Sequence, residues 1–274
     1  MTLKGTIKLV DTHCHLNFEE FDPDRKVIVD RAKEFGITKI LVPGIDVETS
    51  KTAIDCAFEF DEVYAAVGFH PNQGLFWTTS TLSDLRKLAL KEKVVAVGEI
   101  GLDYYRDRAP KELQLRIFSE QLQLAAELGL PVIIHNREAF EDILKTLDNW
   151  CHDLTSTCVE LQNHPGVLHS FSGNEEFAAI INSLNFKIGI TGPVTFKKSQ
   201  SLQAVVASQA IRNMVIETDA PFLAPSPFRG MRNEPANVRI VAEKISEIKE
   251  ISFENVAKIT TDEADMLFQW RDSN

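Results

Sequence analysis

Eight short runs rich in valine and isoleucine recur along the chain, and they constrain its fold more than any other feature. The runs lie at Thr6–Val10, Ile37–Val42, Val63–Val67, Val94–Val97, Pro131–Ile134, Gly166–Leu168, Phe186–Ile190 and Met214–Ile216. Because they are apolar throughout and do not alternate with polar residues, they are typical of parallel strands covered on both faces. Between them lie segments with helical periodicity, such as residues 110–128, where Gly129 supplies a C-terminal stop.

Eight strand–helix units in 274 residues predict an α/β fold of the closed (β/α)8, or TIM barrel, type, which typically takes about 250 residues. The alternative is a doubly wound open sheet. That fold is commonly marked by a Gly-x-Gly-x-x-Gly or Walker loop, and the sequence has neither where one would be expected. No linker, low-complexity tract or short repeat divides the chain, so we expect a single domain over residues 1–274.

Polar side chains of the metal-binding type follow these runs directly. They are His13, His15, His70, Glu99, His135, His169 and Asp219. In a barrel the C-terminal ends of all strands converge on one mouth, where the chemistry is carried out. Five of the seven histidines fall at such positions, and only His152 and His164 lie in an expected loop. The sequence therefore predicts one site assembled from many strand ends.

The arrangement of these residues indicates a metal centre. In a strand, residues i and i+2 point to the same side, so His13 and His15 form half of a site for an ion such as zinc. Six candidate ligands are too many for one structural zinc, but they suit two ions that together activate a water molecule. We expect His13, His15 and Asp219 to hold one ion, His135 and His169 the other, and the Glu99 carboxylate to bridge both.

Composition narrows the class of protein. The net charge of −11 argues against a general nucleic-acid coat protein, although not against an enzyme with a few local basic residues. No apolar stretch approaches the roughly 20 residues that cross a bilayer, and the N-terminal region lacks the apolar segment of a secretory signal. Four cysteines lack the spacing of a disulfide framework; Cys151 and Cys158 could pair, but reduced thiols in a cytoplasmic protein are expected. Nothing in the sequence implies an obligate protein partner.

Seven blocks, in order over nearly the whole chain, resemble the signatures of the TatD-type deoxyribonucleases, which belong to the metal-dependent amidohydrolase-like barrels. They are Asp11–Leu16, Gly68–Pro71, Val97–Tyr104, Pro131–His135, Gly166–Gly173, Glu217–Leu223 and Arg229–Pro235. The resemblance implies metal-dependent DNA hydrolysis and places the family's ligands on the same six residues, His13, His15, Glu99, His135, His169 and Asp219. Magnesium, manganese and zinc all remain open as the metal.

Further residues are expected to take part in catalysis and substrate binding. Asp219 and Glu99 are the predicted catalytic residues, and Asp219 could also accept the proton of the attacking water. We expect His70 to contact the substrate phosphate, Asp103 to orient a ligand histidine and so shape the substrate site, and Arg229 and Arg232 to bind a phosphodiester. Further candidates are the loop lysines Lys197 and Lys198 and the aromatic residues Tyr104, Tyr105 and Phe222, which could stack on a base.

The predicted function is a phosphodiesterase acting on DNA ends or single strands, as an exonuclease, since a single strand can bring its phosphate into a concave mouth. One alternative keeps the metals and cleaves an ester or amide, for instance the ester of a misacylated tRNA. Amidohydrolases proper often carry a carboxylated lysine after the fourth strand; here that place is held by Glu99, which favours the nuclease. A non-enzymatic barrel with structural metal is a third alternative, disfavoured because all six ligands are present.

Two segments depart from the family pattern. Residues 149–165 bear cysteines and look irregular, and we expect them to form a loop longer than the family's usual connection. Near the C-terminus, Glu263 stands where the family often has asparagine. That segment should be a peripheral helix, so this difference is expected to leave catalysis intact.

Overall fold

Eight parallel strands pair in sequence order from β1 to β8 in the computed structural model, which describes residues 7–270 and, at 155–157, the backbone alone. The strands are β1 (Leu9–Asp11), β2 (Ile37–Pro43), β3 (Val63–Val67), β4 (Val94–Asp103), β5 (Val132–Arg137), β6 (Gly166–Leu168), β7 (Lys187–Ile190) and β8 (Met214–Ile216). The circle closes where the amide of Thr12 donates to the carbonyl of Ile216 (3.1 Å) and Cys14 bridges Ala220. The predicted TIM barrel is confirmed.

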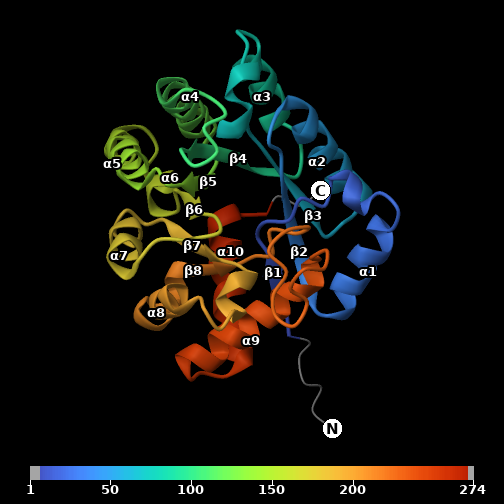
Figure 1. Ribbon diagram of the computed structural model, residues 1–274. Helices are drawn as coiled ribbons and strands as arrows, with labels where there is room; N and C mark the ends of the chain where they lie inside the picture. Colours follow the sequence, from blue (N-terminus) through green and yellow to red (C-terminus); the bar gives the residue numbers. More distant parts are fainter. Residues whose placement is uncertain (1–6, 271–274) are drawn as a thin grey trace.

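Helices surround the strands, and α10 lies behind them in the view of Figure 1, where it contacts β1 and β8. The helices are α1 (Arg25–Glu34), α2 (Val47–Glu59), α3 (Thr81–Ala89), α4 (Lys111–Leu128), α5 (Phe140–Thr157), α6 (Val159–Asn163), α7 (Glu175–Ser183), α8 (Gln200–Ser208), α9 (Val238–Lys249) and α10 (Phe253–Phe268). Short 3-10 turns η1 (Glu19–Phe21), η2 (Pro71–Phe76), η3 (Gly192–Thr195), η4 (Ile211–Asn213) and η5 (Pro235–Asn237) complete the loops. Within residues 7–270, no helix combines the length and the apolar character needed to cross a membrane.

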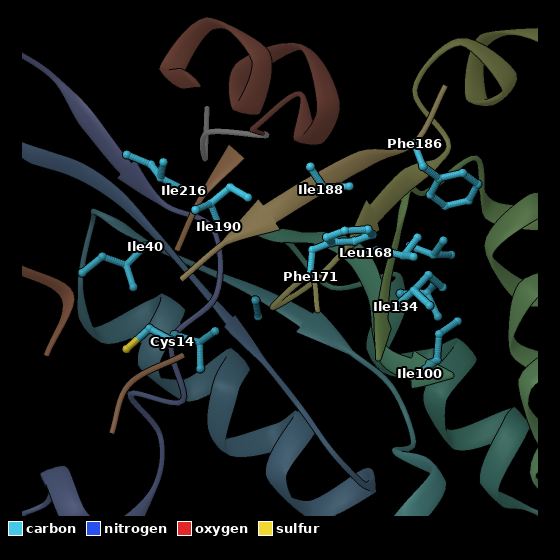
Figure 2. Close-up of a cluster of buried hydrophobic side chains, with 14 of the residues drawn as sticks. Cys14, Ile40, Ile100, Ile134, Leu168, Phe171, Phe186, Ile188, Ile190 and Ile216 are labelled. Atoms are coloured by element: carbon cyan, nitrogen blue, oxygen red, sulfur yellow. The ribbon is translucent and has the colours of Figure 1, made fainter. Parts of the chain in front are cut away.

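The apolar runs pack on two sides, as the sequence pattern predicts. Val10, Leu41, Ile133, Val167 and Val215 belong to one buried cluster that also contains the last turn of α10. Since this cluster draws on almost every strand, it fills the barrel interior. The neighbouring residues along the same strands, including Ile40, Ile134, Leu168 and Ile216, belong to the larger cluster formed with the helices (Figure 2).

The inward-facing positions of the strands lead directly to the candidate ligands. His135 lies two residues after Ile133, and His169 lies two residues after Val167. Because side chains alternate along a strand, these residues also point to the barrel axis, nearer its C-terminal end. The pattern that builds the core therefore also positions the site.

Three expectations need correction or refinement. β4 extends to Asp103 and β5 to Arg137, so Glu99 and His135 lie within strands and not just after them. The loop predicted at 149–165 is wrong: α5 continues to Thr157, α6 follows, and His152 lies within α5. Buried Leu147, Trp150 and Leu154 supply the amphipathic spacing that holds this helix on the barrel. That the segment is longer than in relatives stays a prediction.

Two smaller expectations agree with the structure. No disulfide joins Cys151 and Cys158, and none involves the other two cysteines. Glu263 lies on the peripheral helix α10, where its carboxylate pairs with Lys187. Neither feature lies within the cluster of candidate ligands.

Candidate metal centre

The first ligand group consists of His13, His15 and Asp219, contributed by the ends of β1 and β8. The Nε2 atoms of His13 and His15 lie 3.3 Å apart. Asp219 Oδ1 is 3.7 Å from the first of these nitrogens and 3.6 Å from the second. The amide of Asp219 donates to the carbonyl of His13 (2.8 Å), which ties the two strand ends together. Three potential ligand atoms thus converge on one point.

Glu99 reaches this group with one carboxylate oxygen and a second group with the other. Its Oε2 lies 3.6 Å from His13 Nε2 and 3.7 Å from His15 Nε2. Its Oε1 lies 2.9 Å from His135 Nδ1 and 3.3 Å from His169 Nε2. Glu99 is almost completely buried between the two groups. This two-sided position is what a bridging carboxylate requires.

The spacing of the ligand atoms fits a divalent cation. A zinc–ligand bond of about 2.0–2.2 Å in a tetrahedral site corresponds to ligand–ligand separations of about 3.3–3.6 Å. The separations among the four atoms around His13 and His15, from 3.3 to 3.7 Å, fall close to this range. Imidazole nitrogen and carboxylate oxygen suit zinc and manganese, and carboxylate oxygen suits magnesium. The residues present therefore fit a metal.

Electrostatics also favour a cation in this place. Burial raises the pKa of Glu99, but His169, His70 and other neighbouring histidines outweigh burial and hold the pKa well below its usual value. Burial raises the pKa of Asp219 as well, yet its hydrogen bond with His15 contributes to a net lowering. Both carboxylates are therefore ionised at neutral pH, so the centre offers negative charge to an ion.

The histidines of the two groups differ in proton affinity. Burial lowers the pKa of His13, and His169 lowers it further. Burial also lowers the pKa of His169, but Glu99 and Glu217 reverse this and raise it well above the usual value. For His135, hydrogen bonds with Asp103 and Glu99 outweigh burial and raise the pKa. Without metal, the second ligand group, which consists of His135 and His169 about Glu99 Oε1, therefore binds protons more tightly than His13 does.

We expect metal binding to release protons and to tighten as the pH rises. A cation must displace protons from His169 and His135, whose pKa values are raised, so affinity falls as pH falls through these values. Calorimetry with manganese from about pH 6 to about pH 8, in buffers of different ionisation enthalpy, measures the protons released. Affinity that does not change with pH, with no proton release, would contradict this assignment.

Two carboxylates outside the ligand groups face the outer nitrogens of ligand histidines. Glu217 Oε1 lies 3.3 Å from His169 Nδ1, and Asp103 Oδ2 lies 3.5 Å from His135 Nε2. Such partners fix the orientation of a ligand imidazole and leave its other nitrogen for the metal. The sequence predicted this role for Asp103 but missed Glu217. The sequence did contain a signal for it: Glu217 lies two residues after Val215, so both side chains face the barrel interior.

Gly189 makes room for the Glu217 side chain. A Cβ atom at this position would lie 2.4 to 2.5 Å from the carboxylate atoms of Glu217. Glu217 is fully buried, accepts a hydrogen bond from the amide of Ser170 and lies 3.4 Å from the hydroxyl of Thr12. The missing side chain at 189 therefore allows a carboxylate to stand directly behind His169.

Glu217→Gln is expected to weaken metal binding about 10- to 100-fold, because an amide supports the His169 imidazole less well than a carboxylate does. Equilibrium dialysis against manganese would measure the change. Glu263→Gln is the matched control, since Glu263 is a partly buried carboxylate paired with Lys187 on α10. Equal metal affinity in both variants would exclude the orienting role of Glu217.

For His70, the hydrogen bonds indicate which ring nitrogen carries the hydrogen. Its Nδ1 accepts a hydrogen bond from the amide of Asn72 (3.0 Å), so in the neutral ring Nε2 carries the hydrogen. That Nε2 lies 3.5 Å from Glu99 Oε1. Burial lowers the pKa of His70, with His135 as the next cause. His70 is thus arranged as a neutral hydrogen-bond donor beside the ligand groups.

The two arginines predicted to bind phosphate, Arg229 and Arg232, do not line the cleft. Arg232 donates through its two terminal nitrogens, Nη1 and Nη2, to the Asp24 carboxylate and lies over the Phe21 ring, so its fork is already occupied. Arg229 lies over Phe196, 4.8 Å from its centroid, and is not among the residues that line the cleft. Lys197 and Lys198 are exposed and are also absent from that lining.

The three aromatic candidates have separate surroundings. The hydroxyl of Tyr104 donates to Asp142 (2.6 Å), which anchors the β4–α4 loop, while the Tyr105 ring lies under Arg137. Phe222 is exposed and lines the cleft, together with Phe18 at its edge. Of the three, Phe222 is therefore the one placed to meet a ligand.

The ligand groups lie at the base of an open cleft of about 1060 Å³. Glu99, His135, His169 and Asp219 all line it, which makes the centre accessible from solvent. The volume greatly exceeds what water and two ions would fill. A large substrate can therefore enter at the C-terminal ends of the strands, as in other barrels of this kind.

Comparison with known proteins agrees with this picture. The family model described as TatD related DNase matches residues 10–269. An uncharacterized metal-dependent hydrolase of Bacillus subtilis, YabD, is 42% identical over 95% of this chain and 99% of its own length. A protein of Rahnella sp. named 3'-5' ssDNA/RNA exonuclease TatD is 33% identical over 93% of this chain and 95% of its length. The crystal structure of the TatD homologue YjjV of Escherichia coli has a TM-score of 0.88 at 30% identity, covering 96% of this chain and 99% of that one.

Proposed function

Because this chain belongs to the family of TatD-related DNases, we propose that it is a metal-dependent phosphodiesterase that removes nucleotides from single-stranded DNA or DNA ends. Several relatives are named metal-dependent hydrolases, and one is named an exonuclease on single-stranded DNA and RNA. The observation that carries the proposal is Glu99, which directs one oxygen toward each of two ligand groups.

Two divalent ions are part of the proposal. His13, His15, Asp219 and one oxygen of Glu99 would hold the first ion, and His135, His169 and the other oxygen of Glu99 the second. Bound there, magnesium, manganese or zinc would lower the pKa of a water molecule and neutralise charge on the reacting phosphate. The outer carboxylates Asp103 and Glu217 keep the ligand imidazoles in the orientation that this requires.

The protein's own side chains have distinct tasks in this reaction. His70 donates its Nε2 hydrogen to a non-bridging oxygen of the scissile phosphate, since its other nitrogen is occupied by the amide of Asn72. Asp219, with 15% of its side chain exposed at the cleft, is ionised and accepts the proton of the attacking water. Phe18 and Phe222 line the cleft, with ring centroids 6.4 Å apart, and offer apolar faces to an unpaired base.

The shape of the site favours a single strand over an intact duplex. The ligand groups lie at the base of the cleft, and their histidine side chains are largely buried. A flexible strand can lower one phosphate to that depth, whereas a duplex would first have to open. We place the reaction in the cytoplasm, and cysteines that form no disulfide support this.

The proposal is tested by turnover on a panel of substrates. Protein stripped of metal and reloaded with magnesium, manganese or zinc is mixed with end-labelled single-stranded DNA, RNA, duplex DNA and a set of esters and amides. We expect metal-dependent nucleotide release that is lost in Glu99→Ala and His135→Ala. His152→Ala is the control, because His152 lies on α5 away from the cleft lining.

The same panel can reject the proposal. Cleavage of esters or amides without nucleotide release would indicate the alternative hydrolase. Nucleotide release that persists in both Glu99→Ala and His135→Ala would exclude this centre as its origin.

A further inference from the structure

Three arginines that are not among the residues predicted from the sequence line the cleft. Arg106 and Arg108 lie between β4 and α4, and Arg137 is the last residue of β5. All three are exposed. In a chain with a net charge of −11, these three guanidinium groups, with Glu138 as a neighbouring carboxylate in the lining, bring positive charge into the cleft beyond β4 and β5.

Hydrogen bonds place these arginines next to the second ligand group. Arg137 is the register partner of Asp103, and its carbonyl accepts from the amide of Tyr104 (2.9 Å). The amide of Arg106 donates to Asp103 Oδ1 (2.9 Å). Asp103 Oδ2 in turn lies 3.5 Å from His135 Nε2, so the backbone of Arg106 and of Arg137 starts beside the second ligand group.

The three guanidinium groups keep hydrogen-bond donors available. The guanidinium Nε of Arg106 lies 4.0 Å from Asp103 Oδ2, a long ion-pair distance. Arg137 lies over the Tyr105 ring at 4.5 Å, a contact that orients the guanidinium without using its N–H groups. For Arg108, no ion pair is found with any residue in the described range 7–270. Arg232, by contrast, has both nitrogens on Asp24.

We propose that Arg106, Arg108 and Arg137 form a second phosphate site, which binds the phosphate of the nucleotide adjacent to the scissile bond. This inference rests on the proposed function and specifies its substrate: a chain with at least one flanking phosphate. Guanidinium forks match phosphate oxygens, and the cleft volume of about 1060 Å³ leaves room for the neighbouring nucleotide. The flanking phosphate then holds the scissile one over the metal centre.

The first experiment compares three thymidine dinucleotides: one without a terminal phosphate, one with a 5'-phosphate and one with a 3'-phosphate. We expect the wild-type protein to prefer one of the phosphorylated forms about tenfold in kcat/KM, since a charge-assisted contact is worth about that factor. In the double variant Arg108→Gln, Arg137→Gln, the ratio of kcat/KM between the phosphorylated and the unphosphorylated dinucleotide should fall toward one, mainly through a higher KM for the phosphorylated form.

The matched control is Arg86→Gln, Arg116→Gln. Both arginines lie on helices outside the cleft, where they pair with Glu127 and Glu120. Each double variant removes two positive charges, so a long-range effect of net charge would be the same in both. We expect the control to keep the preference of the wild-type protein.

A second readout separates this inference from the proposed function. In chelator, fluorescence anisotropy of labelled single-stranded oligothymidine measures binding without turnover. The cleft variant should bind about tenfold more weakly and with a smaller salt dependence than the wild type, unlike the control. Such arginine-dependent binding in chelator, together with no nucleotide release by the metal-loaded protein, would support the phosphate site and reject the nuclease. Hydrolysis with no preference among the dinucleotides, or a preference that survives in the cleft variant, would overturn the phosphate site alone.

Discussion

Replacing Glu99 by glutamine is expected to lower kcat/KM for nucleotide release by about 10³-fold or more. Glutamine has nearly the same volume, so the packing of β4 should survive. However, the amide has no charge, and its NH₂ group would face imidazole nitrogens at the positions of Oε1 or Oε2, which lie 2.9 to 3.7 Å from four histidines. One ligand group therefore loses its Glu99 ligand, and the other keeps only a neutral amide oxygen in place of a charged carboxylate oxygen.

Metal content and turnover together check this prediction. We expect Glu99→Gln to retain less metal after dialysis than the wild-type protein, at an unchanged far-UV circular dichroism spectrum. Glu127→Gln is the control, because this glutamate pairs with Arg86 on the outer surface. A Glu99→Gln variant with normal metal content and near-normal turnover would show that the carboxylate does not bridge.

Asp219→Asn should lower kcat by about 10²- to 10⁴-fold, the contribution of a well-placed general base. The asparagine oxygen can still face His13 and His15, but a neutral amide cannot take the proton of water. The backbone of Asp219 is left-handed, with φ of 55°, and asparagine tolerates this conformation nearly as well as any residue except glycine. The variant is therefore expected to fold.

Steady-state kinetics on single-stranded DNA would reveal this effect as a loss in kcat with a smaller change in KM. Asp84→Asn, an exposed carboxylate paired with Lys87 on α3, is the control and should match the wild type. A change confined to KM would mean that Asp219 serves as ligand only. Unchanged kinetics would remove Asp219 from the mechanism.

The local sequence pattern predicts the fold correctly. The errors in the predicted elements arise where tertiary packing decides the structure. The eight apolar runs are visible because each is buried on both faces. The length of β4 was underestimated, since Gly98 and Gly101 interrupt its apolar run and read as turn residues. The helical character of 149–165 was missed because buried Trp150 and Leu154 alternate with many polar residues, and their common face exists only against the barrel.

The parts of the candidate site that lie near the ends of the apolar runs could be predicted from the sequence. The six candidate ligands each follow an apolar run, and the structure brings all six together around Glu99. Arg232 could not be judged from sequence, because its partner Asp24 is far away in the chain. Glu217 lies two residues after the inward-facing Val215, but its partner His169 comes from another strand, so the alternation alone did not give it a role. Arg137 ends β5, and its neighbours Asp103 and Tyr105 come from the preceding strand and loop, which only the fold brings together.

The central proposal is that one carboxylate, Glu99, would hold two cations, one at each of the two ligand groups that its oxygens face. Anomalous diffraction from crystals of the manganese-loaded protein tests this most directly. We expect two peaks about 3.5–4 Å apart, one among His13, His15 and Asp219 and one beside His135 and His169, each within about 2.0–2.3 Å of an oxygen of Glu99. A map with no peak in contact with Glu99, at full activity of the same preparation, would contradict the account.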